Sequence, residues 1–177
     1  MKEFIKVYDN VVKPNHCKAI IDAYENNLKC VEAHDTDGYK FHQLNLNQTP
    51  GLEGLSQAVV GSLIPVYEDY FNRLGFRDYV KIDTFEDIRI KKYRKDADDE
   101  FRTHVDVIDH ASAARFAIAI IYLNDNDGYT VFENLDLAVE PKAGRVVVFP
   151  PFWMFPHSGR IPTVSDKYIM MTCLHYS

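Results

Sequence analysis

The pattern His104-Val105-Asp106 is the first feature of the sequence that could support chemistry, and it closes a segment predicted to be a β-strand. Residues two apart in a strand project to the same face of a sheet, so the imidazole and the carboxylate should point together. These two groups suit divalent iron, and a set of two histidines and one carboxylate leaves coordination positions open for other molecules. Such a pair is by itself more often ordinary solvated surface, and as part of an iron site it would need a third ligand.

His157 is the preferred candidate for that third ligand. It follows the strongly apolar segment 145–149, where the mouth of a β-barrel would lie. His110, four residues past Asp106, is the alternative, although its surroundings are typical of an exposed turn rather than of a rigid position. The pattern favours His157 and leaves His110 open.

Lys167 stands ten residues after His157, at the start of the last predicted strand. A buried lysine is costly unless it meets an anion, so this position could hold a carboxylate of a ligand. Its place in the sequence by itself favours a surface lysine at a strand edge. Arg160 is a rival carboxylate binder, but its place after Gly159 suits a loop better than the floor of a barrel.

The first half of the chain is predicted to supply two helices that support these residues. After a short strand at 4–8, apolar residues recur at three-to-four spacing over 15–26 and again over 55–74, which indicates amphipathic helices. Gly75 stands where a C-terminal cap belongs, and Pro65 is expected to kink or restart the longer helix.

From Asp83 onward, short runs rich in Ile, Val, Tyr and Phe alternate with turn clusters, a spacing typical of antiparallel β-structure. The expected strands are 88–93, 102–106, 115–123, 130–132, 138–140, 145–149 and 167–175. The charged stretch 94–100 is predicted to be a solvated loop. Helices before a run of short strands predict an α+β, mainly β fold, a double-stranded β-helix (jelly roll) with flanking N-terminal helices.

Length and composition predict one domain over residues 1–177 and a cytoplasmic protein. The chain has 20 basic and 26 acidic residues and no basic cluster interleaved with aromatics, so nucleic acid is not an expected partner. Charges interrupt the N-terminal apolar run, and no stretch of about 20 apolar residues predicts a membrane span. Three cysteines without Cys-x-x-Cys spacing, at 17, 30 and 173, are expected to stay reduced.

The order of several motifs resembles the prolyl 4-hydroxylase-type 2-oxoglutarate oxygenases. The motifs are His104-x-Asp106, Arg115, Tyr122-Leu123-Asn124-Asp125, Gly128-x-Thr130-x-Phe132, Pro141-x-Ala143-Gly144-Arg145, Phe149-Pro150, His157-x-Gly159 and Lys167-Tyr168. The N-terminal segment Phe4-Ile5-x-Val7-Tyr8-Asp9-Asn10-Val11 is also similar to the first strand of that family. Motifs in a fixed order are more specific than any one of them.

The resemblance implies roles for six residues. The ligands of iron(II) would be His104, Asp106 and His157. Lys167 would form an ion pair with the C5 carboxylate of 2-oxoglutarate, Tyr122 would hydrogen-bond the same carboxylate, and Tyr93 would line the pocket. Two positions depart from the family pattern, because Asp127 stands where a glycine is usual and Cys173 where a tryptophan often lies.

The resemblance also implies the reaction. The cofactors would be Fe(II), 2-oxoglutarate and O2, with ascorbate as a supporting reductant, and the products succinate, CO2 and a hydroxylated substrate. The expected substrate is a prolyl residue of a peptide or protein, which aromatic residues at 129, 152, 153 and 155 could receive. A free amino acid or other small molecule is the alternative substrate, and a catalytically silent jelly-roll binding module is the alternative function.

Overall fold

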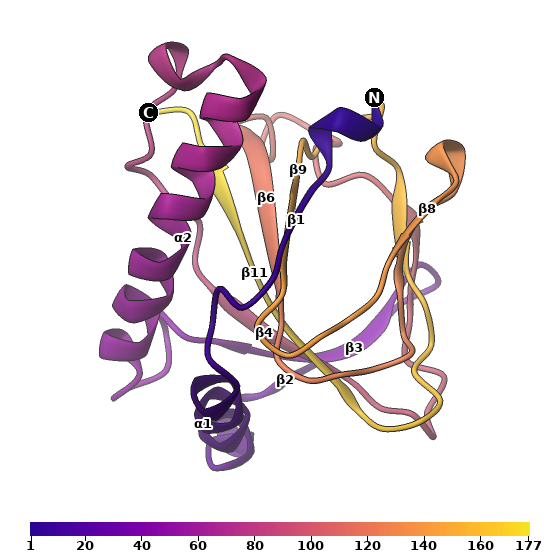
Figure 1. Ribbon diagram of the computed structural model, residues 1–177. Coiled ribbons are helices and arrows are strands. Elements are labelled where there is room, and N and C mark those ends of the chain that lie inside the picture. The colour runs from indigo at the N-terminus through magenta and orange to yellow at the C-terminus, as the bar shows by residue number, and fades with distance from the viewer.

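The computed structural model describes residues 1–177 as two facing antiparallel sheets with helices on one side (Figure 1). The larger sheet has seven strands in the order β1 (Lys6–Tyr8), β9 (Val146–Phe149), β6 (Arg115–Tyr122), β11 (Lys167–His175), β4 (Arg89–Tyr93), β3 (Lys40–Asn45) and β2 (Glu32–Asp35). The smaller sheet has four strands in the order β5 (Phe101–His104), β10 (His157–Gly159), β7 (Thr130–Phe132) and β8 (Leu137–Val139). The predicted mainly β jelly-roll fold is confirmed.

Helices α1 (Pro14–Glu25) and α2 (Glu53–Leu74) lie on the face of the larger sheet that is turned away from the smaller sheet (Figure 1). Because successive strand residues face opposite sides, each central strand contributes to two cores. Strand β6 packs Ala117, Ala119 and Ile121 into the core beneath the helices. The intervening Ile118, Ile120 and Tyr122 enter the core between the sheets.

Both predicted helices are present, and Gly75 ends α2 with a φ of 75°, as expected of a glycine cap. Of the two effects expected at Pro65, a restart does not occur, because the helix runs without interruption from Glu53 to Leu74. The strand at 4–8 is shorter than predicted: a single turn of 3₁₀ helix, Lys2–Phe4, precedes β1.

Two strands of the larger sheet, β2 and β3, were not predicted. Their sequences are largely polar, and in β3 only Phe41 and Leu44 are buried. The strand predicted at 102–106 is shifted, since β5 ends at His104 and Asp106 lies beyond it. The sequence predicted that His157 follows a strand, but in the structure it is the first residue of β10.

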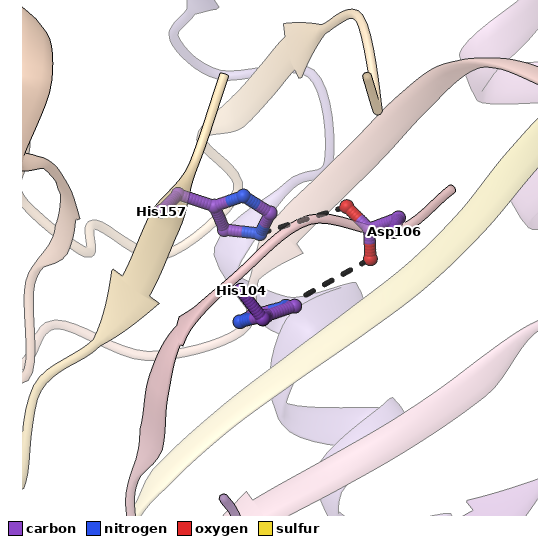
Figure 2. Close-up of side chains that lie close together, drawn as sticks. All are labelled: His104, Asp106 and His157. Carbon is purple, nitrogen blue, oxygen red and sulfur yellow. Dashed lines mark ion pairs between the residues drawn. The ribbon is translucent and has the colours of Figure 1, made fainter. Parts of the chain in front are cut away.

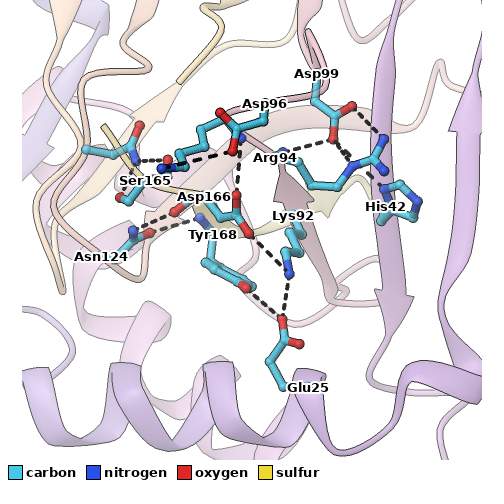
Figure 3. A network of polar contacts seen from close by, with 12 residues as sticks. Glu25, His42, Lys92, Arg94, Asp96, Asp99, Asn124, Ser165, Asp166 and Tyr168 are labelled. Atoms are coloured by element: carbon cyan, nitrogen blue, oxygen red, sulfur yellow. Dashed lines mark hydrogen bonds and ion pairs between the residues drawn. The ribbon is translucent and has the colours of Figure 1, made fainter. Parts of the chain in front are cut away.

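A network of charged groups ties the outer side of the larger sheet to α1 (Figure 3). Lys92 Nζ lies 2.9 Å from Glu25 Oε1 on α1 and 3.3 Å from Asp166 Oδ2. Nearby, the carboxylate of Asp99 accepts hydrogen bonds from Arg94 Nε at 2.9 Å and from the Arg94 backbone N–H at 2.8 Å. Asp99 is completely buried, so the expectation that 94–100 is simply a solvated loop is wrong at this residue.

The three cysteines are free thiols, with Cys17 and Cys173 buried and Cys30 half-buried. Neither helix combines the length and hydropathy that crossing a bilayer would require.

Candidate active site

The smaller sheet and the loop that follows β5 bring His104, Asp106 and His157 together (Figure 2). The histidines face each other across the pairing of β5 with β10, where His157 is the register partner of His104. One potential ligand atom from each of the three side chains lies within 4.8 Å of the others. Asp106 stands between the rings: Oδ1 is 3.8 Å from His104 Nε2, and Oδ2 is 3.7 Å from His157 Nε2.

Backbone carbonyls fix both imidazole rings. His104 Nδ1 lies 2.8 Å from the carbonyl oxygen of Arg102, and His157 Nδ1 lies 3.2 Å from that of Phe155. A carbonyl only accepts, so each Nδ1 carries the proton and each Nε2 keeps its lone pair toward Asp106. Histidines that bind metal through one nitrogen are commonly oriented by such a hydrogen bond from the other.

Burial also keeps the imidazoles neutral. It lowers the pKa of His104 to about 4, with the neighbouring His157 as a second cause. Burial lowers the pKa of His157 as well. Both rings are therefore in the uncharged form that binds metal ions at neutral pH.

Asp106 is held through its backbone while part of its carboxylate is left without a partner. Its N–H donates to the carbonyl of Pro151 at 3.1 Å, and its carbonyl accepts from Arg115 Nη1 at 2.8 Å. Arg115 is itself fixed by Glu86 Oε1, at 3.0 Å from Nε and 2.7 Å from Nη2. The buried Oδ2 of Asp106 has no hydrogen-bond donor. Such an atom is costly unless it meets a cation, so these residues fit an iron(II) ion.

Lys167 lines the same cavity and is only 2% exposed. Its Nζ donates to the carbonyls of Gly128 at 2.9 Å and Arg160 at 3.3 Å, and it lies 4.5 Å from the centre of the Tyr93 ring. Burial lowers the pKa of Lys167 to about 7, although Asp127 acts against this. No protein carboxylate forms an ion pair with this ammonium, which leaves it available to an anion in the cavity.

The other predicted site residues differ in their positions. Tyr93 is buried and lines the cavity, as expected. Tyr122 is completely buried, and its hydroxyl donates to Thr130 Oγ1 at 2.7 Å, so Thr130 rather than Tyr122 lines the cavity. The side chain of Arg160 is 59% exposed and points to Glu133, and His110 is exposed and outside the cluster of ligand atoms.

Lys91 is a cavity residue that the sequence reasoning missed. It is only 6% exposed and shares the inner face of β4 with Tyr93. Its Nζ lies 4.3 Å from the centre of the Phe41 ring and 5.0 Å from that of Phe101, and it makes no hydrogen bond. Burial lowers the pKa of Lys91 to about 8, an effect that the negative charge of Asp106 opposes. The two-residue spacing to Tyr93 in a predicted strand was the signal that could have revealed it.

Comparison with known proteins identifies the family. Residues 88–175 match the model of the 2OG-Fe(II) oxygenase superfamily, a range that contains all three clustered residues as well as Lys91 and Lys167. The chain belongs to this superfamily. It is an enzyme that uses Fe(II), 2-oxoglutarate and O2, as the motif order had indicated.

Solved prolyl hydroxylase structures share the fold of this oxygenase. The viral collagen prolyl hydroxylase of Paramecium Bursaria Chlorella virus-1, in complex with 2-oxoglutarate, is 18% identical with a TM-score of 0.75, covering 98% of this chain and 97% of that one. A Pseudomonas putida prolyl-4-hydroxylase is 15% identical with a TM-score of 0.74, covering 98% and 93%. A Trichoplax adhaerens prolyl hydroxylase, in complex with a peptide fragment of the hypoxia inducible factor oxygen degradation domain, is 11% identical with a TM-score of 0.74, covering 98% and 84%. No curated protein is similar enough in sequence to count as a relative.

Proposed function

We propose that this oxygenase, acting as a single domain over residues 1–177, hydroxylates prolyl residues in an extended peptide or protein segment. In this proposal His104, Asp106 and His157 hold iron(II), and Lys167 holds the C5 carboxylate of 2-oxoglutarate. One observation carries the assignment: a cluster of two neutral imidazoles and a carboxylate shares a cavity with a buried ammonium that has no carboxylate partner. These are the complementary groups that a divalent iron ion and a dicarboxylate need.

Each residue of the cavity has a distinct task. The two imidazoles and Asp106 bind the metal through atoms that backbone hydrogen bonds have already oriented. Lys167 and Tyr93 form the cationic end of the cavity, where an ammonium over an aromatic face receives a carboxylate. When bound, iron(II) and 2-oxoglutarate supply the oxidation by O2 that hydroxylates the substrate and releases succinate and CO2.

The rim beside Asp106 supports a peptide substrate. The backbone N–H groups of Asp106 and Val107 both donate to the carbonyl of Pro151, which joins the two loops next to the metal site. These loops carry Ile108, 77% exposed, and Trp153, 76% exposed. An exposed aromatic and apolar rim accepts proline-containing segments, whose extended backbone has a low ordering cost.

The aromatic lining expected from the sequence is only partly available to such a substrate. Phe155 is 2% exposed and packs edge-on against Phe4, and Phe152 packs against the core beneath the helices. Tyr129 is half-buried, so Trp153, the most exposed of the four, is the main aromatic candidate for substrate contact. The solved relatives support the same substrate class, because one is a collagen prolyl hydroxylase and another binds a peptide.

The test is a turnover assay with a panel of substrates. The protein is incubated with Fe(II), ascorbate and 2-oxoglutarate together with proline-containing peptides, free L-proline or other free amino acids. Succinate is measured, and the position of the added oxygen is found by fragmentation in a mass spectrometer. Hydroxylated prolyl residues are expected, and reactions without 2-oxoglutarate should be inert. Hydroxylation of free amino acids with untouched peptides would overturn the peptidyl assignment.

A further inference from the structure

Two adjacent lysines on β4 have opposite surroundings. Lys92 faces α1, where Glu25 and Asp166 both pair with its ammonium (Figure 3). Lys91 faces the cavity between the sheets, where its Nζ has no hydrogen-bond acceptor and no carboxylate within ion-pair distance. The faces of the Phe41 and Phe101 rings lie 4.3 and 5.0 Å from it. A buried cation without an anion is costly, so its retention at this position points to an anion that the protein itself does not supply.

Lys91 and Lys167 stand at successive levels of the same cavity wall. In the pairing of β4 with β11, Lys167 is opposite Tyr93, and Lys91 is opposite Ile169. The two lysines are thus diagonal neighbours on adjacent strands, and their backbone attachment points lie about 7 to 8 Å apart. The chain of 2-oxoglutarate has four carbon–carbon bonds of about 1.5 Å, so its terminal carbons are at most about 5 Å apart. This separation leaves room for each ammonium group to meet one end of a single five-carbon dicarboxylate.

The position of Lys91 is close to the metal ligands rather than to the rim. The Phe101 ring, 5.0 Å from Lys91 Nζ, stacks on the imidazole of His104 with 3.6 Å between ring centres. Lys91 is also buried, whereas the rim residues Ile108 and Trp153 are exposed. An anion that reaches Lys91 must therefore lie inside the cavity, beside His104 and Asp106.

We propose that Lys91 is a second anion-binding residue of the cosubstrate site and pairs with the carboxylate at the 2-oxo end of 2-oxoglutarate. Lys167 binds the opposite end, so this inference rests on the role given to Lys167 in the proposed function. Two buried ammonium groups in one cavity repel each other, and the single carboxylate of Asp106 cannot neutralise both of them and a divalent metal ion. A dicarboxylate supplies one negative charge for each lysine.

The experiment separates the two ends of the cosubstrate by using two ligands. The first is 2-oxoglutarate, and the second is 2-oxopentanoate, which has the same five-carbon 2-oxo acid chain without the C5 carboxylate. Binding of each to the Mn(II)-loaded protein is measured by isothermal titration calorimetry, so the readout does not depend on turnover. Lys91→Met is expected to lower the affinity for both ligands by a similar factor, about 30-fold or more. Lys167→Met should lower the affinity for 2-oxoglutarate by a comparable factor and leave the affinity for 2-oxopentanoate nearly unchanged.

Two further measurements distinguish loss of the ammonium from loss of the fold. Lys91→Met removes an unpaired buried charge, so the metal-free variant should melt at the same or a higher temperature than the wild type. It should also bind Mn(II) at least as tightly, because a positive charge near Asp106 has been removed. Lys92→Met is the matched control: it loses two ion pairs on the outer face and should melt at a lower temperature, with wild-type affinity for both ligands.

The outcomes test the proposed function and the role of Lys91 separately. If the wild-type Mn(II)-loaded protein fails to bind 2-oxoglutarate, the proposed function is overturned, and this inference with it. If the wild type binds and Lys91→Met binds both ligands equally well, the role of Lys91 alone is overturned. Normal binding of both ligands by Lys91→Met together with weaker binding of the peptide would likewise overturn it, because the ammonium would then serve the substrate.

Discussion

The outer face of β4 and the cavity on its inner face contain similar charged groups, but only those on the outer face are paired with one another. On the outer face, Lys92, Glu25 and Asp166 satisfy one another in a closed network. On the inner face, Lys91 and Lys167 have no carboxylate partners, and Asp106 Oδ2 has no donor. The outer groups hold elements together, whereas the inner groups are left without a partner of opposite charge. Polar groups that break the rule of mutual satisfaction are expected where a protein binds something else.

The largest loss of activity is expected when one of the three clustered residues is replaced. His104→Ala, Asp106→Ala and His157→Ala should each abolish succinate formation while the far-UV circular dichroism spectrum is retained, because loss of one of three ligands cripples metal binding but leaves the β-core packed. His110→Ala is the matched control and should remain active. Near-normal turnover in any of the three variants would remove that residue from the proposed site.

The second largest effect is expected at Lys167. Lys167→Ala should raise the concentration of 2-oxoglutarate needed for half-maximal turnover strongly, because a buried carboxylate left without its cation costs about 2 to 5 kcal/mol. Arg160→Ala should change it little, since that side chain is exposed and points to Glu133. Steady-state kinetics with varied 2-oxoglutarate provide the measurement. If the two variants ranked in the reverse order, Arg160 would be the anchor.

A third prediction concerns the protons taken up by the inner lysine Lys167 when 2-oxoglutarate binds. Burial holds the pKa of Lys167 at about 7, below its ordinary value of 10.5, and a bound carboxylate raises it again. Binding of 2-oxoglutarate near pH 8.5 should therefore take up protons, whereas binding near pH 6, where Lys167 is already charged, should take up few. Calorimetric titrations in buffers of different ionisation enthalpy measure the uptake. Lys167→Met should reduce it, and an unchanged uptake would assign the protons to another group.

The smallest effect is expected in the outer network. Burial lowers the pKa of Lys92, but Tyr168 and Glu25 raise it by more, to above its ordinary value. This lysine therefore stays charged throughout the pH range of the assays. Glu25→Gln should lower the free energy of unfolding by about 1 kcal/mol, since Glu25 is partly exposed and the pair is screened by solvent. Chemical denaturation measures this, and the affinity for 2-oxoglutarate should not change. Weakened cosubstrate binding would show that the two faces are coupled.

Local periodicity in the sequence was sufficient to predict the helices and strands whose hydrophobic pattern repeats within one segment. The three-to-four spacing in α1 and α2 and the apolar runs of β6, β9 and β11 each reflect burial of one face or of both. Motif order was sufficient for the family and its cofactors. In β2 and β3 the same reasoning failed, because their sequences are polar and their strand conformation depends on the pairing of β3 with β4 and of β2 with β3.

Only the tertiary structure decided which of the candidate groups meet. His104 and His157 are 53 residues apart in sequence and become neighbours through the pairing of β5 with β10. Arg160 and Tyr122 matched the requirements for a carboxylate binder by residue type, yet the Arg160 side chain points outward and the Tyr122 hydroxyl is taken by Thr130. Lys91 is a charged residue in a strand, and apart from its two-residue spacing to Tyr93 nothing in its local sequence distinguishes it from Lys92. Which of the two enters the cavity is set by the register of β4 against β11 and β3, since a shift of one residue would exchange their faces.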